Sequence, residues 1–367
     1  AVENQLRILY LDLSGGICDV QLETKKTTIV DIAKLAGVSK TTVSRYINGH
    51  SEFMSSETAE RLEQIIRETE YIPSNLARSL KSKKTRMIGV IIASLSSPFS
   101  AAVMMGIGNV LEKNGYTPLF VNTDDRPEVE IRFLHSLIEK NVDGLIVNAT
   151  RTTCPELIHA ARLGMPIVLC DREVQNHTFD IVMSENRNMV FQAIAHLKEQ
   201  GYNRVALFSQ NWEHSSTRQK RLLFYQEALQ YHFNQINTPD IYLVEDSAMN
   251  PLEQYLSSLG HSDIPAILCS NSETTLLTNY AIQMKGLSMP QEIGLCGADD
   301  WEAWMSWPEI LRTSITTMDI QARQIAEQAA TLLLEKLEHK SDETRQIVVP
   351  GGLTVRDSSR RLNPKTA

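Results

Sequence analysis

The apolar positions between residues 28 and 49 recur at the spacing of two short helices separated by a glycine. The first helix carries its apolar residues on one face: Ile29, Ile32, Ala33 and Ala36. Thr28 and Asp31 fit a capping box at its start. Gly37 provides a turn conformation that other residues adopt only with strain. The pattern therefore predicts a helix, a tight turn and a second helix.

The second helix of this pair exposes a polar face. Ser39 can cap it, and Val43 and Ile47, four residues apart, face the first helix. The residues predicted to contact DNA here are Lys40, Thr41, Ser44, Arg45 and Asn48. Such residues at the exposed start of a second helix read base edges in a DNA major groove. An ordinary helical hairpin with a solvated polar face remains the alternative.

Residues 56 to 69 carry a third amphipathic pattern, which closes a three-helix headpiece. Its inward-facing residues are Ala59, Leu62, Ile65 and Ile66. The segment 73 to 80 comes next, and residues 81 to 86 form a polar, basic link. A segment this short is not a stable helix unaided. The alternative to an unstable segment is a fourth headpiece helix in which Leu76 and Leu80 are core residues.

After Arg86 the pattern changes to short apolar runs that alternate with amphipathic helices. Strands are predicted at residues 87–93, 118–122, 144–148, 166–170, 204–208, 241–244, 266–269 and 293–296, with helices between them, including 100–114 and 129–140. Continuous apolar strands of this kind belong in parallel sheets that helices cover on both faces. The pattern therefore predicts a doubly wound α/β body.

Charge is segregated along the chain. The chain as a whole has a formal net charge of −8. Residues 25 to 86 hold seven Lys and five Arg against seven Asp or Glu, a net +5, which leaves −13 for the rest. A basic segment on an acidic body favours phosphate binding at one end and weak nonspecific adsorption elsewhere.

The cysteines and apolar runs exclude several classes of protein. Cys18, Cys154, Cys170, Cys269 and Cys296 are scattered and form no Cys-x-x-Cys pair, so they are interpreted as buried residues in a reducing compartment. No apolar run reaches the roughly 20 residues that span a bilayer, and the start lacks a secretion signal. We expect a cytoplasmic protein without metal or cofactor. An enzyme would need a nucleophile-base pair, a metal cluster or a phosphate loop, and the sequence shows none of these.

From Thr27 onward the chain resembles the lactose-repressor and galactose-repressor (LacI/GalR) family of bacterial transcription regulators. The resemblance rests on the helix-turn-helix, the segment from Tyr71 to Leu80 and the doubly wound body. It implies an all-α headpiece with a hinge helix, followed by two doubly wound parallel-sheet subdomains of the periplasmic-binding-protein type. In that family the hinge becomes helical on operator DNA, pairs with its dimer mate and inserts a leucine into the minor groove. The matching position is Leu80, and Asn75 and Ala77 are the further hinge contacts implied.

The resemblance also implies the domain boundaries. The expected divisions are an extension at 1–26, the headpiece at 27–72, the hinge and linker at 73–86, a first subdomain at 87–183 plus 319–349, a second at 184–318 plus 350–360, and a tail at 361–367. Three crossings would join the subdomains, and the cleft between them would hold an effector.

Seven residues are candidates for binding that effector: Phe99, Asn148, Asp171, Arg172, Arg221, Asn271 and Asp299. Five of them directly follow apolar runs, where parallel sheets bind ligands. The resemblance adds that Phe99 stacks on the ligand, that Arg221 grips hydroxyls or carboxylates, and that Asp299 accepts from sugar hydroxyls. Ordinary alternatives are helix capping by Asn271 or Asp299, a core position for Phe99, and a salt bridge from Arg221 to Glu213 or Glu227.

Several departures from the family pattern leave the effector open. Leu223 to Tyr225 replaces a small glycine, so the bulky Phe224 must be accommodated. Ser272 stands where an aspartate commonly follows the asparagine. Trp301, Trp304 and Trp307 crowd the loop after Asp299 and predict either an aromatic wall on the ligand or, as favoured here, a packed lid.

Residues 1 to 26 precede the start of the resemblance. Leu6 to Leu13 has the composition of a strand, with no obvious partner behind it. An unpaired short strand is not stable, so we expect this extension to be disordered, or else added or misassigned ahead of the natural start.

These observations predict a homodimeric repressor of a carbohydrate-utilisation operon. Its partners would be operator DNA and a small sugar or sugar-acid effector, and it would not associate with a membrane. The alternatives are a global regulator with a phosphorylated protein corepressor and, as a weaker one, a solute-binding protein or enzyme that uses the same cleft.

Overall fold

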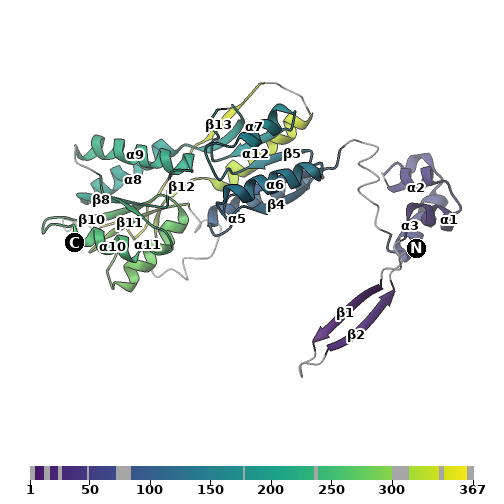
Figure 1. Ribbon diagram of the computed structural model, residues 1–367, viewed down its shortest axis with the longest axis horizontal. Coiled ribbons are helices and arrows are strands. Elements are labelled where there is room, and N and C mark those ends of the chain that lie inside the picture. The colour runs from purple at the N-terminus through teal and green to yellow at the C-terminus, as the bar shows by residue number, and fades with distance from the viewer. Residues whose placement is uncertain are drawn as a thin grey trace. The chain divides into compact units, whose positions relative to one another are not determined.

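The computed structural model describes residues 5–11, 17–23, 27–47, 49–71, 84–176, 178–234, 239–299, 314–338 and 343–361. The chain divides into two compact units, Ala1–Lys84 and Thr85–Ala367, which are taken in turn below (Figure 1). Within the described ranges, no helix is long and apolar enough to cross a membrane.

The first unit opens with a β-hairpin that the sequence analysis missed. β1 (Gln5–Leu11) pairs antiparallel with β2 (Ile17–Glu23). The expectation that the first strand has no partner was therefore wrong, and these two ranges are not disordered. Apolar and polar residues alternate along β2, a strand pattern that had been overlooked.

Three helices follow, as the apolar spacing predicted, with a short 3-10 turn between the second and the third. They are α1 (Ile29–Ala36), α2 (Lys40–Ile47), η1 (Ser51–Phe53) and α3 (Ser56–Glu68). The capping box of α1 is confirmed, because the Asp31 amide donates to Thr28 Oγ1 and the Thr28 amide donates to the Asp31 carboxylate. Gly37 adopts the left-handed conformation, with φ 66°. Ser39 caps α2 by accepting from the Thr42 amide at 3.1 Å.

A small apolar core holds these helices together. Its fully buried members are Ile32, Val43 and Leu62, one from each helix. Ala33, Ala36 and Tyr71 complete the buried set, and Ile47, Ile65 and Ile66 pack around it. The inward faces predicted for the three helices are thus confirmed. The hinge segment 73–80, with its alternative as a fourth core helix, lies outside the described residues.

The first subdomain of the second unit is a six-stranded parallel sheet in the order β13-β7-β6-β5-β3-β4. Its strands are β3 (Met87–Ile92), β4 (Thr117–Asn122), β5 (Gly144–Val147), β6 (Ile167–Cys170), β7 (Asp180–Ser184) and β13 (Gln346–Val349). Its helices are α5 (Pro98–Lys113), α6 (Pro127–Glu139), α7 (Pro155–Arg162) and α12 (Ala322–Glu338).

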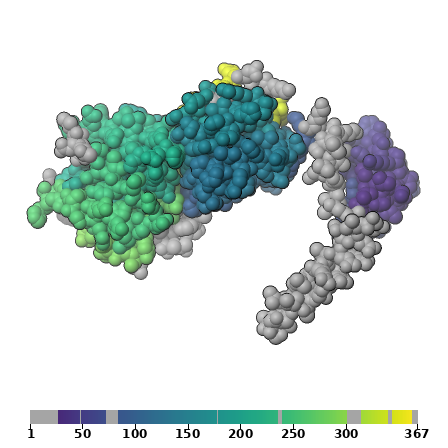
Figure 2. Space-filling model, in the orientation of Figure 1, coloured from purple at the N-terminus to yellow at the C-terminus, as the bar shows by residue number. Residues whose placement is uncertain are grey.

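The second subdomain repeats this plan in the order β14-β12-β11-β10-β8-β9, with only β14 antiparallel to its neighbour. Its strands are β8 (Arg204–Ser209), β9 (Ile241–Leu243), β10 (Pro265–Cys269), β11 (Gly294–Ala298), β12 (Thr316–Asp319) and β14 (Gly352–Thr354). Its helices are α8 (Asn186–Glu199), α9 (Ser216–Phe233), α10 (Met249–Ser257) and α11 (Ser272–Met284). In Figure 2, blue residues of the first subdomain lie against green residues of the second.

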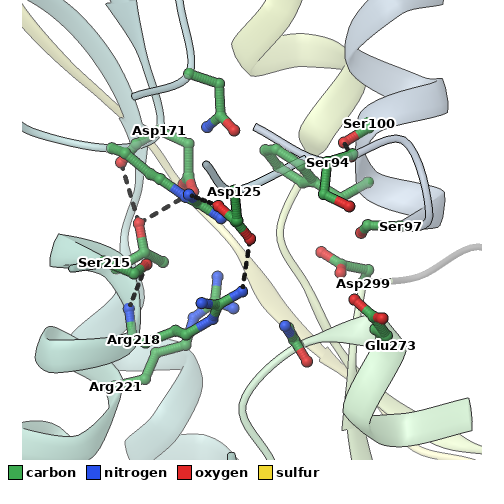
Figure 3. Close-up of a pocket in the computed structure, with 15 residues that line it drawn as sticks. Ser94, Ser97, Ser100, Asp125, Asp171, Ser215, Arg218, Arg221, Glu273 and Asp299 are labelled. Carbon is green, nitrogen blue, oxygen red and sulfur yellow. Dashed lines mark hydrogen bonds and ion pairs between the residues drawn. The ribbon is translucent and has the colours of Figure 1, made fainter. Parts of the chain in front are cut away.

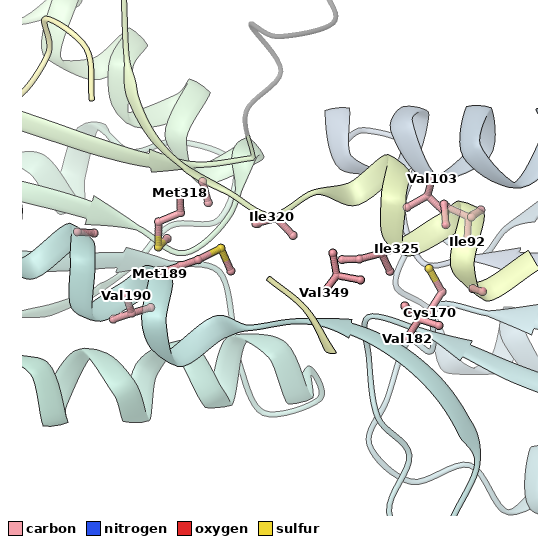
Figure 4. Packing of buried hydrophobic residues seen from close by; sticks show 14 of the residues in the cluster. Ile92, Val103, Cys170, Val182, Met189, Val190, Met318, Ile320, Ile325 and Val349 are labelled. Atoms are coloured by element: carbon pink, nitrogen blue, oxygen red, sulfur yellow. The ribbon is translucent and has the colours of Figure 1, made fainter. Parts of the chain in front are cut away.

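The chain passes between the two sheets after β7, after β12 and after β13. The largest apolar cluster follows these crossings and runs through both subdomains. Figure 4 shows Met318 and Ile320 beside the crossing that leads into α12, with Ile325 and Val349 next to them. The far faces of the two sheets have separate apolar clusters. Helices therefore cover both faces of each sheet, as predicted for continuous apolar strands.

Candidate functional site

A polar pocket lies where the two subdomains face each other. Its empty volume, which includes open solvent at the mouth, is about 520 Å³. All seven residues predicted for the effector site line it: Phe99, Asn148, Asp171, Arg172, Arg221, Asn271 and Asp299 (Figure 3). Five of them follow strands, and parallel strands in each sheet end at the same edge. Phe99 and Arg221 lie on helices and were predicted with the help of the family resemblance.

Asp171 and Asp299 occupy matching places in the two subdomains. Each follows a buried strand, has φ 67° and donates its amide to the neighbouring strand, Asp171 to the Val182 carbonyl at 2.8 Å and Asp299 to the Met318 carbonyl at 3.0 Å. Left-handed backbone at a residue other than glycine costs about 1–3 kcal/mol and clusters at ligand sites. The two subdomains therefore present one carboxylate each to the pocket by the same local device.

Arg221 is buried in the pocket wall and is held by neutral groups. Its Nε donates to Asn186 Oδ1 at 2.8 Å and its Nη1 to the Ser270 carbonyl at 2.5 Å. The salt bridges considered as alternatives do not form, since Glu227 pairs with Arg187 at 3.4 Å. Neutral partners orient the guanidinium without cancelling its charge, so the charge remains available to a ligand.

Asp299 has one carboxylate oxygen without a hydrogen-bond partner. Its Oδ2 accepts from the Ser272 amide at 3.1 Å, and its Oδ1 is buried without a hydrogen-bond partner. Burial raises the pKa of this carboxyl above its ordinary value, although nearby Arg221 opposes the shift. A buried oxygen without a partner costs free energy, and a ligand hydroxyl would satisfy it.

Asn271 combines the ordinary and the functional assignments. Its Oδ1 caps α11 by accepting from the Thr274 amide at 3.0 Å, so the capping alternative is correct. Its Nδ2 donates to Gln210 Oε1 at 2.7 Å, at the pocket edge. Phe99 likewise lines the pocket while packing against the main apolar cluster.

Three charged residues of the pocket were missed by the sequence analysis, namely Asp125, Arg218 and Glu273. Asp125 Oδ1 lies 2.8 Å from Arg172 Nη1, and Asp125 Oδ2 lies 3.5 Å from Arg218 Nη2. Asp125 follows β4 and would have been found by the strand-end rule, whereas Arg218 lies one helical turn before Arg221. Burial alone would raise the pKa of Asp125, but the two arginines outweigh it and lower that pKa.

Hydrogen bonds and ion pairs tie the two sides of the pocket together. Thr217 Oγ1 donates to Asp171 Oδ2 at 3.1 Å. The Ser97 and Ser272 hydroxyls are 2.9 Å apart, and Lys220 Nζ lies 2.7 Å from Glu173 Oε1. Each pair joins one subdomain to the other. The pocket geometry therefore depends on how the subdomains are arranged.

The departures from the expected pattern are partly explained. Phe224 is half-buried against the main apolar cluster, which accommodates the bulky side chain, while Leu223 is exposed. The Ser272 side chain is fully buried. Trp301, Trp304 and Trp307 lie outside the described residues, so the choice between an aromatic wall and a packed lid remains a prediction.

The headpiece presents a second candidate site. Lys40, Thr41 and Arg45 are exposed at α2, and Ser44 is half-buried. The Arg45 guanidinium lies 5.5 Å from the centre of the Phe53 ring, a neighbour that the sequence analysis missed. The other residues predicted to contact DNA, Asn48, Asn75, Ala77 and Leu80, lie outside the described residues.

The cysteines with described side chains are buried free thiols: Cys154, Cys170, Cys269 and Cys296. Burial raises the pKa of Cys154 to about 11 and that of Cys269 to about 12. Thiols with raised pKa are poor nucleophiles. In the ranges that the structure describes, no group of three or more His, Cys, Asp or Glu could hold a metal ion.

Comparisons with known proteins match both units. The profile "Bacterial regulatory proteins, lacI family" matches residues 28–74, and the profile "Periplasmic binding proteins and sugar binding domain of LacI family" matches residues 85–359. The transcriptional regulator KdgR of Bacillus subtilis is 32% identical over 91% of this chain and 98% of its own length. The regulator PtxS of Pseudomonas plecoglossicida is 33% identical over 91% and 96%. A crystal structure of the lac repressor dimer bound to operator and the anti-inducer ONPF has the same fold, with a TM-score of 0.78 and 24% identity over 92% of this chain and all of that one.

Proposed function

This chain belongs to the LacI family of bacterial regulatory proteins and is a DNA-binding transcriptional repressor, and from that premise we propose that a small sugar or sugar acid in the cleft controls its affinity for operator DNA. The genes it controls would then serve carbohydrate utilisation. The convergence of seven predicted side chains on one pocket between the subdomains carries this proposal.

The chemistry of the pocket supports a ligand rich in hydroxyl groups. Arg221 offers guanidinium donors, and Asp299 Oδ1 is a buried acceptor without a partner. Sugars present hydroxyls that both donate and accept, so they match such a mixed set of groups. The ligand would lie against residues of both subdomains and would bind one arrangement of them more tightly than another.

Control of DNA binding follows if that arrangement sets the spacing of two hinges in a dimer. The lac repressor, which this chain resembles in fold, is a dimer in its operator complex. Exposed apolar side chains on α5 and α11, namely Met105, Tyr280 and Met284, support a dimer through the subdomain faces. A ligand that shifts the first subdomains relative to each other would move the hinges, so effector and operator binding would be linked.

The experiment is a pair of reciprocal titrations. Candidate sugars and sugar acids are screened by thermal shift, and the affinity of a hit is then measured by calorimetry with and without operator DNA. A coupling free energy of about 1–3 kcal/mol would change each affinity roughly 5- to 150-fold. Identical affinities in the two titrations would contradict control by the cleft.

Variants locate the coupling in the pocket. Arg221→Ala and Asp299→Ala remove groups that line it and should abolish the response to the effector. Each variant is first titrated with operator alone, so that its response is compared with its own effector-free affinity. Arg345→Ala, which removes an exposed arginine paired with Glu335, serves as the control and should respond like the wild type.

A further inference from the structure

We propose, on the basis of the function proposed above, that the effector carries a carboxylate, and that Arg172 and Arg218 bind this carboxylate in the place now taken by the side chain of Asp125. Asp125 would then act as an internal substitute for the ligand's acid group. The effector class is a hydroxylated carboxylic acid, such as an aldonate or a uronate.

The three residues come from three different elements that meet at the pocket. Asp125 follows β4, Arg172 lies in the loop after β6, and Arg218 lies in the first turn of α9. Arg172 and Asp125 belong to the first subdomain and Arg218 to the second, so the carboxylate bridges the cleft. Figure 3 shows Asp125 between the side chains that it joins.

The two guanidinium groups carry more positive charge than Asp125 neutralises. Apart from Asp125, their hydrogen bonds go to neutral oxygens: Arg172 donates to the Ala149 carbonyl at 3.0 Å, and Arg218 donates to Gln210 Oε1 at 2.7 Å and to the Asn211 carbonyl at 3.0 Å. Glu273 lies near enough to favour the charged form of Arg218, but its Oε2 accepts from the Ser96 hydroxyl.

The electrostatics of Arg218 agree with this excess of charge. Burial, followed by the positive charge of Arg172, lowers the pKa of Arg218 to about 10, although Asp125 and Glu273 act in the opposite direction. Two nearby cations in a desolvated site repel each other. Once Asp125 is displaced, a carboxylate of the ligand would again screen the two cations from each other, and a neutral hydroxyl would not. Planar guanidinium groups also match a carboxylate geometrically.

The position of Asp125 allows its side chain to move away from Arg172 and Arg218. Its side chain is 36% exposed, whereas those of Arg172 and Arg218 are 13% exposed. Asp124 and Asp125 both have left-handed backbone, with φ 59° and 50°, a conformation that costs free energy for residues other than glycine. The arginines are thus fixed in the wall, and the carboxylate is on a strained loop at the solvent edge.

Other pocket groups suit the rest of such a ligand. Asp299 lines the second-subdomain wall, and its Oδ1 is buried without a hydrogen-bond partner. This oxygen is an acceptor that fits a hydroxyl group of a sugar chain. The pocket therefore offers cations for an acid group and polar neutral or acceptor groups for hydroxyls.

The test compares ligands that differ only in the acid group. Calorimetry on the full chain at pH 7.5 would use gluconate and galactonate against glucitol and galactitol, and glucuronate and galacturonate against glucose and galactose. At least one acid should bind roughly tenfold or more tightly than its neutral counterpart, the effect of one charge-assisted hydrogen bond. A neutral compound that binds as tightly as its acid would overturn the proposal. So would the absence of acid binding at up to about 10 mM, roughly ten times a Kd of about 1 mM.

Variants separate the parts of the subsite. Arg218→Met should weaken acid binding roughly tenfold. Arg218→Lys retains the charge but not the planar guanidinium group, so its affinity for the acid should lie between those of the wild type and Arg218→Met. Asp125→Asn removes the competing carboxylate and should tighten acid binding. Weaker acid binding by Asp125→Asn would overturn the proposed displacement. Arg345→Met is the matched arginine control and should bind acids like the wild type.

Operator titrations distinguish this inference from the function on which it rests. If an acid binds through Arg218 but operator affinity stays constant, the control of DNA binding fails and the carboxylate subsite stands. If a neutral sugar binds and changes operator affinity, the control stands and the carboxylate subsite fails.

Discussion

Thr217 donates its hydroxyl to the carboxylate of Asp171 at 3.1 Å, and both residues are buried. The two residues lie on opposite sides of the cleft, one in the first turn of α9 and the other directly after β6. This contact joins the subdomains through a carboxylate that also lines the pocket. A change at Thr217 should therefore affect both stability and ligand binding.

Thr217→Val keeps the shape of the side chain and removes the donor. It should lower the free energy of unfolding of the second unit by about 1.5–3 kcal/mol, because the carboxylate loses a buried hydrogen bond. Urea unfolding followed by circular dichroism measures the change. Thr331→Val is the control, since the Thr331 hydroxyl lies on an exposed helix face. Equal losses in the two variants would contradict a special role for the cross-cleft bond.

Arg45→Ala should cost about 1–3 kcal/mol at a specific operator site, because the exposed start of α2 is the part expected to read bases. Binding to random DNA should suffer less. Band-shift titrations on both duplexes at one salt concentration measure the difference. Arg67→Ala, at an exposed arginine of α3 paired with Glu63, is the control. Equal losses on specific and random DNA would reject base reading by Arg45.

Leu80→Ala tests the hinge prediction, which concerns a residue outside the described ranges. Loss of a minor-groove wedge should reduce operator affinity and DNA bending together. A circular-permutation assay measures the bend, and Leu163→Ala, at a largely exposed leucine, is the control. Unchanged bending with a large fall in the melting temperature of the headpiece would instead support a core position.

Gly37→Ala should lower the free energy of unfolding of the headpiece by about 1–2 kcal/mol, the cost of a left-handed conformation for an L-residue. No atom lies within 4 Å of the position that the added Cβ would take, so the cost is conformational and not steric. Gly37→Asn should lose less, since asparagine tolerates this conformation. Thermal unfolding compares the two, and equal losses would contradict the conformational explanation.

His196 should make the second unit less stable in mild acid. Its Nε2 is hydrogen-bonded to the Ser359 hydroxyl, 2.8 Å away. Burial lowers the pKa of His196 below the ordinary 6.5. Below about pH 6.5 the histidine of the unfolded chain is therefore protonated to a greater extent than that of the folded chain. Because the unfolded state binds more protons, the free energy of unfolding falls as the pH drops from 7 to 5. His196→Gln should flatten this dependence.

The measurement is urea unfolding at several pH values. His232→Gln is the comparison, because burial and Lys198 also lower the pKa of His232, which is a less buried residue. An unchanged slope in His196→Gln would show that other groups cause the acid sensitivity.

Local patterns in the sequence were enough to predict the headpiece and most of the strands. Thr28, Gly37 and Ser39 act through neighbours within five residues, so their roles can be recognised without a fold. The same holds for the long apolar strands. Five strands of the described residues were missed, namely β2, β7, β12, β13 and β14. Several of these contain Thr, Ser, Asp or Gly and become strands by pairing with distant segments, as β13 does with β7.

The sequence also predicted which residues gather at the cleft, since strand ends converge whatever the side chains are. It did not determine which side chains pair there. A salt bridge from Arg221 to Glu227, six residues away, was one alternative, but Arg221 contacts Asn186 on another helix. Arg172 donates a hydrogen bond to Asp125, which is 47 residues away in the sequence. Thr217 donates one to Asp171 in the other subdomain. Such partners are chosen by distance in space, which depends on the packing of the whole fold, so only the tertiary structure decided them.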